Sequence, residues 1–188
     1  IIGYTDSEDK GEILKIKYLG SDNQLENIKQ EYNCENAVVA IGSIGNTTVR
    51  ERVYTNLKNK GYILPIIIAK SSIIAEDVEI QEGTVIMDGV IVQPSVKVGI
   101  CAIINTKSSI DHDCTIGNFV HLAPGVTLSG TVNVGNNSHL GTGVNVINNV
   151  SIGNNCLIGV GSLIIKDCNE SGIYIGIPAR LVQRYKNE

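Results

Sequence analysis

The side chains best suited to acid–base chemistry lie close together in the second half of the chain. His112 stands between two aspartates, and all three histidines fall between residues 112 and 139. A carboxylate beside an imidazole orients the ring and raises its basicity, as general-base catalysis requires. Asn105 precedes this string and His121 follows it. The pattern indicates a proton-transfer site centred on His112 and Asp113.

The composition excludes several other kinds of site. Lys and Arg are scattered in a chain of net charge −4, so nucleic acid is not expected as a partner. No apolar run approaches the length of a membrane span, and the first residues lack the pattern of a signal peptide. The five cysteines are odd in number and lack metal-ligand spacing. We therefore expect reduced thiols in a cytoplasmic protein.

A strict six-residue repeat must position the candidate site. Every sixth residue from Ile68 to Ile164 is aliphatic, and the residue four places after each is small or β-branched. Glycines also recur every eighteen residues: Gly99, Gly117, Gly135 and Gly153. Gly and the Asn that follows most of them tolerate positive φ, which predicts one corner per coil. Three hexads per coil predict a triangular parallel β-helix over residues 67–170, with coils about 4.8 Å apart.

The eighteen-residue coil also predicts which side chains are neighbours. Residue 130 lies one coil above residue 112, so Gly130 is expected over His112, and His139 over His121. An unobstructed glycine N–H beside a general base could stabilise a developing oxyanion. Cys114, Cys156 and Cys168 fall in the column of small core residues and are not expected to react.

Two other interpretations of the histidines remain open. Three histidines could bind zinc, as in trimeric β-solenoids that act as carbonic anhydrases. Their spacings here are nine and eighteen, with no pair five apart of the kind those enzymes use, so no metal is expected. The solenoid could also be a non-catalytic scaffold.

The two ends of the chain do not follow the repeat. Alternating β and α patterns predict a small open parallel sheet, Rossmann-like, over residues 1–66. We expect strands at 1–6, 37–42 and 62–67, with helices at 21–32 and 46–60. A leading strand and a glycine-rich loop are expected to be missing from this α/β domain, which makes it N-terminally truncated. Residues 171–188 form a tail.

Five segments of the repeat and tail form a more specific signature. They are Asn105-Thr106, Ile110-Asp111-His112-Asp113-Cys114, His121-Leu122-Ala123-Pro124-Gly125, Leu128-Ser129-Gly130-Thr131-Val132 and Gly176-Ile177-Pro178-Ala179-Arg180. This signature resembles the hexapeptide-repeat acyltransferases, in particular the sugar-nucleotide amino-N-acetyltransferases and sialic acid O-acetyltransferases. The resemblance implies a left-handed β-helix and a homotrimer with active sites between subunits.

The resemblance also implies roles for individual residues. His112 would be the general base, Asp113 its partner, and the Gly130 N–H would bind the thioester carbonyl of acetyl-CoA. The acceptor would be a small-molecule nucleotide sugar held by the N-terminal domain. The implied substrate-binding residues are Asp6, Gly42, Arg50, Asn105 and His121, and those for the cofactor are Gly130, Gly141, Gly143, Gly159, Gly161 and Arg180.

The chain departs from the family's pattern in three places. It lacks the opening strand and glycine-rich turn, it has Ile68-Ala69-Lys70 where many members have His-Pro, and His139 replaces a residue that is usually aromatic. The expected reaction is acetyl transfer to the amino group of a nucleotide-linked amino sugar in one ternary complex. O-acetylation of a sugar such as sialic acid is the alternative, because the same base would serve both.

Overall fold

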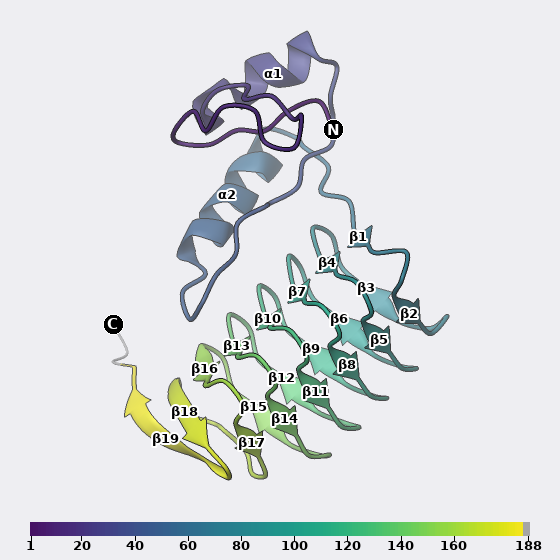
Figure 1. Ribbon diagram of the computed structural model, residues 1–188, viewed down its shortest axis with the longest axis vertical. Helices are drawn as coiled ribbons and strands as arrows, with labels where there is room; N and C mark the ends of the chain where they lie inside the picture. Colours follow the sequence, from purple (N-terminus) through teal and green to yellow (C-terminus); the bar gives the residue numbers. More distant parts are fainter. Residues whose placement is uncertain (186–188) are drawn as a thin grey trace.

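A solenoid of short parallel strands makes up most of the computed structural model, which describes residues 1–185. Its coils stack in chain order from β1 to β17, and the unit formed by the first part of the chain stands on one side of the stack (Figure 1). The strands form three sheets, one along each face of the prism. The predicted mainly β fold is confirmed.

The sheets differ in length but share one construction, in which nearly every strand is two residues long. The eight-stranded sheet contains β1 (Ile67–Ile68), β4 (Val85–Ile86), β7 (Ile103–Ile104), β10 (His121–Leu122), β13 (His139–Leu140), β16 (Cys156–Ile158), β18 (Gly172–Gly176) and β19 (Ala179–Arg184). The six-stranded sheet contains β2 (Ile73–Ile74), β5 (Ile91–Val92), β8 (Ser109–Ile110), β11 (Thr127–Leu128), β14 (Asn145–Val146) and β17 (Leu163–Ile164). The five-stranded sheet contains β3 (Glu79–Ile80), β6 (Lys97–Val98), β9 (Thr115–Ile116), β12 (Asn133–Val134) and β15 (Ser151–Ile152).

The register within the sheets follows the eighteen-residue coil. Leu122 pairs in parallel with Ile104 below it and Leu140 above it. The aliphatic column points inward, so that these three side chains have no exposed surface. The column of small residues completes each layer, and Cys114, Cys156 and Cys168 are buried there as free thiols, as predicted. Thin layers of Ile, Val and Leu therefore fill the prism.

The recurring glycine corner has a different physical basis from the one expected. Gly117 has no positive φ; a Cβ on it would instead lie 2.5 Å from Oδ1 of Asn136 in the next coil. Oδ1 of Asn136 accepts the Asn118 N–H at 2.8 Å, and Oδ1 of Asn154 accepts the Asn136 N–H at 2.7 Å. Glycine is needed because an asparagine ladder climbs this corner, while the left-handed conformation falls on residues such as Phe119, one place after the asparagine.

The N-terminal unit contains the predicted helices within narrower bounds. A 3-10 turn, η1 (Asp22–Gln24), leads into α1 (Leu25–Glu31), and α2 (Thr48–Asn59) follows. Leu25 and Leu57 pack with Tyr62 and Leu64 in a second apolar cluster, which also includes Cys101 of the solenoid. The unit is thereby fixed to the solenoid through a shared apolar contact.

The predicted strands of this unit are wrong as regular strands. Isolated parallel bridges join Tyr4 to Tyr18 and Asn36 to Ile63, and no ladder extends over 1–6 or 37–42. Val38 is 44% exposed, so the segment expected as a buried strand is open on one side. A strand with few neighbours forms few ladder hydrogen bonds and stays irregular.

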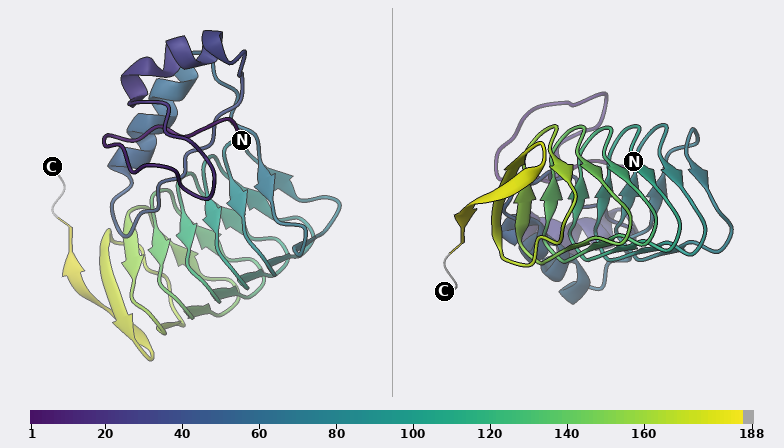
Figure 2. Two further views of the ribbon diagram at one scale, coloured as in Figure 1. Left: turned by 45° about the horizontal axis from the view of Figure 1, so that its top comes forward. Right: turned by 90° about the horizontal axis from the view of Figure 1, so that it is seen from below.

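The C-terminal tail closes the far end of the stack. β18 continues the eight-stranded sheet in parallel with β16, and β19 folds back on it antiparallel. Figure 2 shows this hairpin at the opposite end of the solenoid from β1.

Candidate active site

The corner after β8 presents His112 with its aspartate neighbours. Asp113 adopts a left-handed φ of 58°, and its Oδ2 lies 2.7 Å from Nδ1 of His112. Because an ionised carboxylate only accepts, Nδ1 carries a proton, so in the neutral ring Nε2 is the free base. Asp111 accepts the His112 backbone N–H at 2.8 Å. The hydrogen bond to Asp113 raises the pKa of His112 above its ordinary value, although the side chain remains accessible.

Gly130 lies against the His112 ring, as the coil length predicted. A Cβ on Gly130 would stand 2.6 Å from Nε2 of His112, so a larger residue here would push the imidazole out of this position. Within residues 1–185 the Gly130 N–H has no hydrogen-bond acceptor. Pro94 occupies the same corner position one coil below His112, which shows that coil pairing does not use this N–H. A base and a free donor therefore stand side by side.

A second polar group lies on a different edge of the prism. Nδ2 of Asn105, which follows β7, lies 3.2 Å from Nε2 of His121 on β10. Nδ1 of His121 lies 2.9 Å from the Ser43 carbonyl. His139, on the adjacent strand, stacks edge-to-face against His121 with ring centroids 4.8 Å apart. Burial lowers the pKa of His121 and, more strongly, the pKa of His139, to about 4.

One chain does not bring these two groups together. His112 follows a strand of the six-stranded sheet, whereas Asn105 follows β7 and His121 lies on β10, both strands of the eight-stranded sheet. In the part of the chain that the structure describes, no hydrogen bond joins the groups. Within one chain, the residues expected from the sequence therefore form two separate groups.

The predicted substrate residues of the N-terminal unit differ in their surroundings. Arg50 is only 2% exposed, and its guanidinium donates to the Ser43 hydroxyl and to the Phe119 and Cys101 carbonyls. A group so enclosed has no open surface for a substrate, which is a correction to the direct contact expected. Gly42 is open, with nothing within 4 Å of a built Cβ. The Glu8 N–H and the Ser7 hydroxyl bond the Asp6 carboxylate and lower its pKa.

The four glycines expected to line the cofactor's path also differ, because two are open and two are crowded. A Cβ on Gly143 or Gly161 would meet nothing within 4 Å, so both leave open surface. Gly141 and Gly159 are crowded by the next coil or the hairpin. All four N–H groups donate to backbone carbonyls, at 2.8–3.0 Å. This edge can therefore offer a ligand close approach, but not these four donors.

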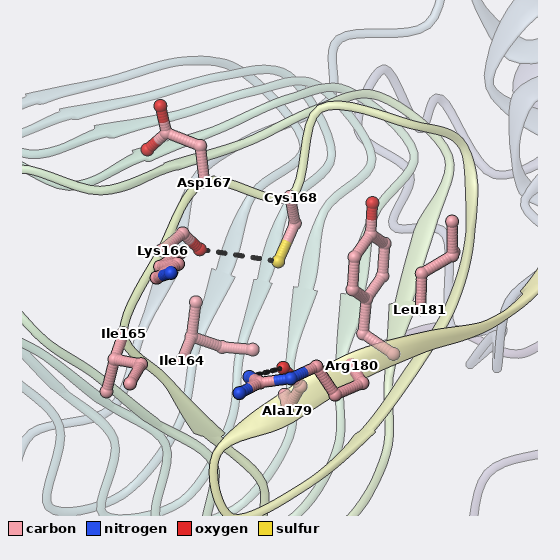
Figure 3. Close-up of a pocket in the computed structure, with 9 residues that line it drawn as sticks. Ile164, Ile165, Lys166, Asp167, Cys168, Ala179, Arg180 and Leu181 are labelled. Atoms are coloured by element: carbon pink, nitrogen blue, oxygen red, sulfur yellow. Dashed lines mark hydrogen bonds between the residues drawn. The ribbon is translucent and has the colours of Figure 1, made fainter.

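Arg180 lines a cavity of about 310 Å³ at the C-terminal end of the solenoid. Figure 3 shows Ile164 and Leu181 on its walls and Lys166 and Asp167 at the turn above. The cavity lies between the last coil and the β18–β19 hairpin, several coils beyond His112. Its apolar walls and two cationic side chains are separate from the acid–base group.

Within residues 1–185, no group of three His, Cys, Asp or Glu side chains is arranged to hold a metal ion. The helices of this part of the chain are all too short or too polar to cross a membrane.

The sequence revealed neither the part of Ser43 in the second group nor the burial of His139. Ser43 acts through its backbone carbonyl, which no residue pattern marks. The repeat did place His139 over His121, but its burial depends on the turn before α2 covering the outer face of the sheet.

No protein-family model matches the chain, but solved structures are similar to it. A histidine-to-asparagine variant of perosamine N-acetyltransferase from Caulobacter crescentus, in complex with CoA and GDP-perosamine, is 31% identical, with a TM-score of 0.90 over 95% of this chain and 83% of that one. The acetyltransferase domain of PglB from Neisseria gonorrhoeae, in complex with acetyl coenzyme A, is 28% identical, with a TM-score of 0.89 over 96% and 86%. WeeI from Acinetobacter baumannii, 24% identical with a TM-score of 0.86 over 96% and 85%, shares the fold.

These similarities extend over both the N-terminal unit and the solenoid, because they cover nearly the whole chain. The family, the acetyl-CoA-dependent N-acetyltransferase class and acetyl-CoA as co-substrate, all predicted from the sequence, are confirmed. The chain belongs to the hexapeptide-repeat acyltransferases that fold as a left-handed β-helix.

Proposed function

We propose that this enzyme transfers the acetyl group of acetyl-CoA to the amino group of a nucleotide-linked amino sugar, with His112 as general base. The observation that carries the proposal is the Asp113–His112 pair, whose free Nε2 stands against Gly130. The similar enzyme from Caulobacter binds CoA and GDP-perosamine, which supports an amino sugar on a nucleotide as acceptor.

The proposed reaction has two steps within one ternary complex. The amine nitrogen attacks the thioester carbonyl carbon while Nε2 of His112 takes a proton from that nitrogen, and the Gly130 N–H stabilises the oxyanion. The C–S bond then breaks, and the CoA thiolate receives the proton from the His112 imidazolium. No acyl-enzyme is needed, since burial raises the pKa of Cys101 to about 11 and of Cys168 to about 12.

We further propose a homotrimer in which the His112–Gly130 group of one copy meets the Asn105–His121 group of the next. The support is that the two halves lie on different edges of one prism and that a symmetric ring would juxtapose them. Exposed aliphatic side chains on the outer faces, such as Ile73 at 66%, suit burial between copies. Four buried free cysteines support a reducing compartment, the cytoplasm.

The test replaces His112 and compares acceptors. His112→Ala should reduce CoA release by about 10²–10⁴-fold, the usual contribution of a general base, and leave the oligomer intact. Asn148→Ala, at the same corner two coils higher, is the matched control and should retain normal turnover. Near-normal activity of His112→Ala would refute the proposed base.

Acceptor assays separate the alternatives. GDP-perosamine and other amino-sugar nucleotides should be acetylated by the wild-type enzyme, whereas sialic acid should not. Preference for sialic acid would replace the proposal with O-acetylation. Failure to bind acetyl-CoA by calorimetry would favour the scaffold interpretation.

A further inference from the structure

The turn before α2 fixes the protonation state of His121. The Ser43 carbonyl lies 2.9 Å from Nδ1 of His121, and a carbonyl only accepts hydrogen bonds. Nδ1 therefore carries the proton, and Nε2 presents its lone pair to the Asn105 amide 3.2 Å away. His121 is held as the neutral Nδ1–H tautomer.

Asn105 is oriented from its other side. Its Oδ1 accepts the Thr106 backbone N–H at 2.8 Å and the Thr106 hydroxyl at 3.3 Å. Because the backbone N–H can only donate, the oxygen must face Thr106 and the NH₂ group must face His121. One Nδ2 hydrogen bonds His121, and within residues 1–185 the other has no acceptor and can meet a ligand.

Arg50 holds the turn that supplies the Ser43 carbonyl. Nη1 donates to the Ser43 hydroxyl at 3.2 Å and to the Phe119 carbonyl at 3.2 Å, and Nη2 donates to the Cys101 carbonyl. These contacts join α2, the turn and two successive coils of the solenoid. The buried guanidinium is held by carbonyl and hydroxyl oxygens rather than by a carboxylate, and its Nε has no partner within the described residues. The cost of taking the guanidinium out of water offsets part of what these hydrogen bonds contribute to stability.

The charged and titratable groups facing His121 all favour its neutral form. Burial lowers the pKa of His121, and the positive charge of Arg50 from α2 lowers it further. His139 from β13 packs against the ring and is itself neutral above about pH 4. A neutral ring beside Asn105 does not repel a positively charged amine as it arrives.

We propose that Arg50 is a positioning residue for the acceptor: through Ser43 it holds His121 as the Nδ1–H tautomer, and His121 in turn aims the free N–H of Asn105 at the acceptor. The inference rests on the proposed function, in which Asn105 and His121 line the acceptor site. It replaces direct substrate contact by Arg50 with an action through two intermediate groups.

The first test reads the tautomer without any substrate. Nitrogen-15 NMR of the wild-type enzyme should show His121 as the Nδ1–H form, and Arg50→Met should give a mixture of tautomers or a raised His121 pKa. Arg52→Met, an exposed arginine on the same helix, is the matched control and should match the wild type. An unchanged His121 signal in Arg50→Met would overturn the proposal.

The second test separates positioning from a merely structural role. Arg50→Met should raise the KM for the amino-sugar nucleotide by about tenfold, the loss of one hydrogen bond, with the KM for acetyl-CoA unchanged. Arg50→Lys should restore little, because an ammonium lacks the planar fork that reaches three oxygens. A changed tautomer with an unchanged acceptor KM would also overturn the proposal.

A third variant covers the case in which Arg50→Met does not fold. Ser43→Ala removes the hydroxyl that Arg50 holds but keeps the carbonyl, so it should shift the His121 signal in the same direction by less. No shift would refute the link. A fully active His112→Ala would refute the proposed base but would not change the His121 tautomer measured by NMR. Failure of the proposed function and failure of the Arg50 proposal are therefore distinguishable.

Discussion

His139 offers a stability test whose sign follows from burial. His139 is only 8% exposed, and its Nδ1 has no hydrogen-bond partner within residues 1–185. His139→Phe keeps a flat ring against His121 and removes the unpaired nitrogen. A buried polar group without a partner costs about 1–3 kcal/mol, so the variant should be more stable than the wild type at pH 7 by this order.

The pH dependence gives a second, independent magnitude. Burial lowers the pKa of His139 from 6.5 to about 4, so the folded state resists protonation more than the unfolded state. Its contribution to stability is complete above pH 6.5 and is lost as the pH falls toward 4. Because the unfolded group titrates near 6.5 and the folded group near 4, the wild type should lose about 2 kcal/mol between pH 6.5 and 4.5 that His139→Phe does not lose.

Urea denaturation followed by far-UV circular dichroism measures both effects, at one protein concentration because the proposed assembly would contribute to stability. His112→Asn is a control of opposite sign, because the folded pKa of His112 is raised. Parallel stability-against-pH curves for wild type and His139→Phe would refute the reasoning, since they would mean that His139 titrates alike folded and unfolded.

Three further predictions concern the site and the core. Gly130→Ala places a Cβ 2.6 Å from Nε2 of His112, so kcat should fall by about 10²–10³-fold with the oligomer unchanged by light scattering; an active variant would exclude the tight fit. The rate should rise with pH as His112 loses its proton. Asp113→Asn should move this rising limb of the pH–rate profile to lower pH, because it removes the largest cause that raises the pKa of His112. A limb that stays in place would contradict the pairing of His112 with Asp113. Ile110→Ala, fully buried, should lower the unfolding free energy by about 2–5 kcal/mol in urea, against little change for its strand neighbour variant Ser109→Ala.

The sequence predicted the solenoid because two positions in every six, from residue 68 onward, follow one local rule. Inward positions are fixed by the period, and the pairing of His121 with His139 follows from the coil length alone. The Gly130–His112 contact could be predicted for the same reason. Contacts that the repeat length fixes can therefore be predicted from the sequence alone.

The N-terminal unit has no such rule, and there the predictions failed in detail. The strands expected at 1–6 and 37–42 reduce to single bridges, because strand formation depends on neighbours that are distant in sequence. Arg50 was assigned to the substrate only because the family resemblance implied it. Only the docking of α2 against Cys101 and Phe119 shows that its guanidinium is enclosed.

The solenoid has two repeat lengths, six residues for a hexad and eighteen residues for a full coil. Removal of six residues, such as 115–120, would keep the aliphatic and small columns in phase, so the prism could still close. Every later residue would then move to a neighbouring face of the prism. His121 would no longer pair with β7 and would leave the face that holds Asn105. Length changes in steps of six preserve the fold, but only steps of eighteen preserve the neighbours on which the chemistry depends. Among descendants of such a chain, insertions of one or two hexads should yield well-folded proteins that no longer catalyse.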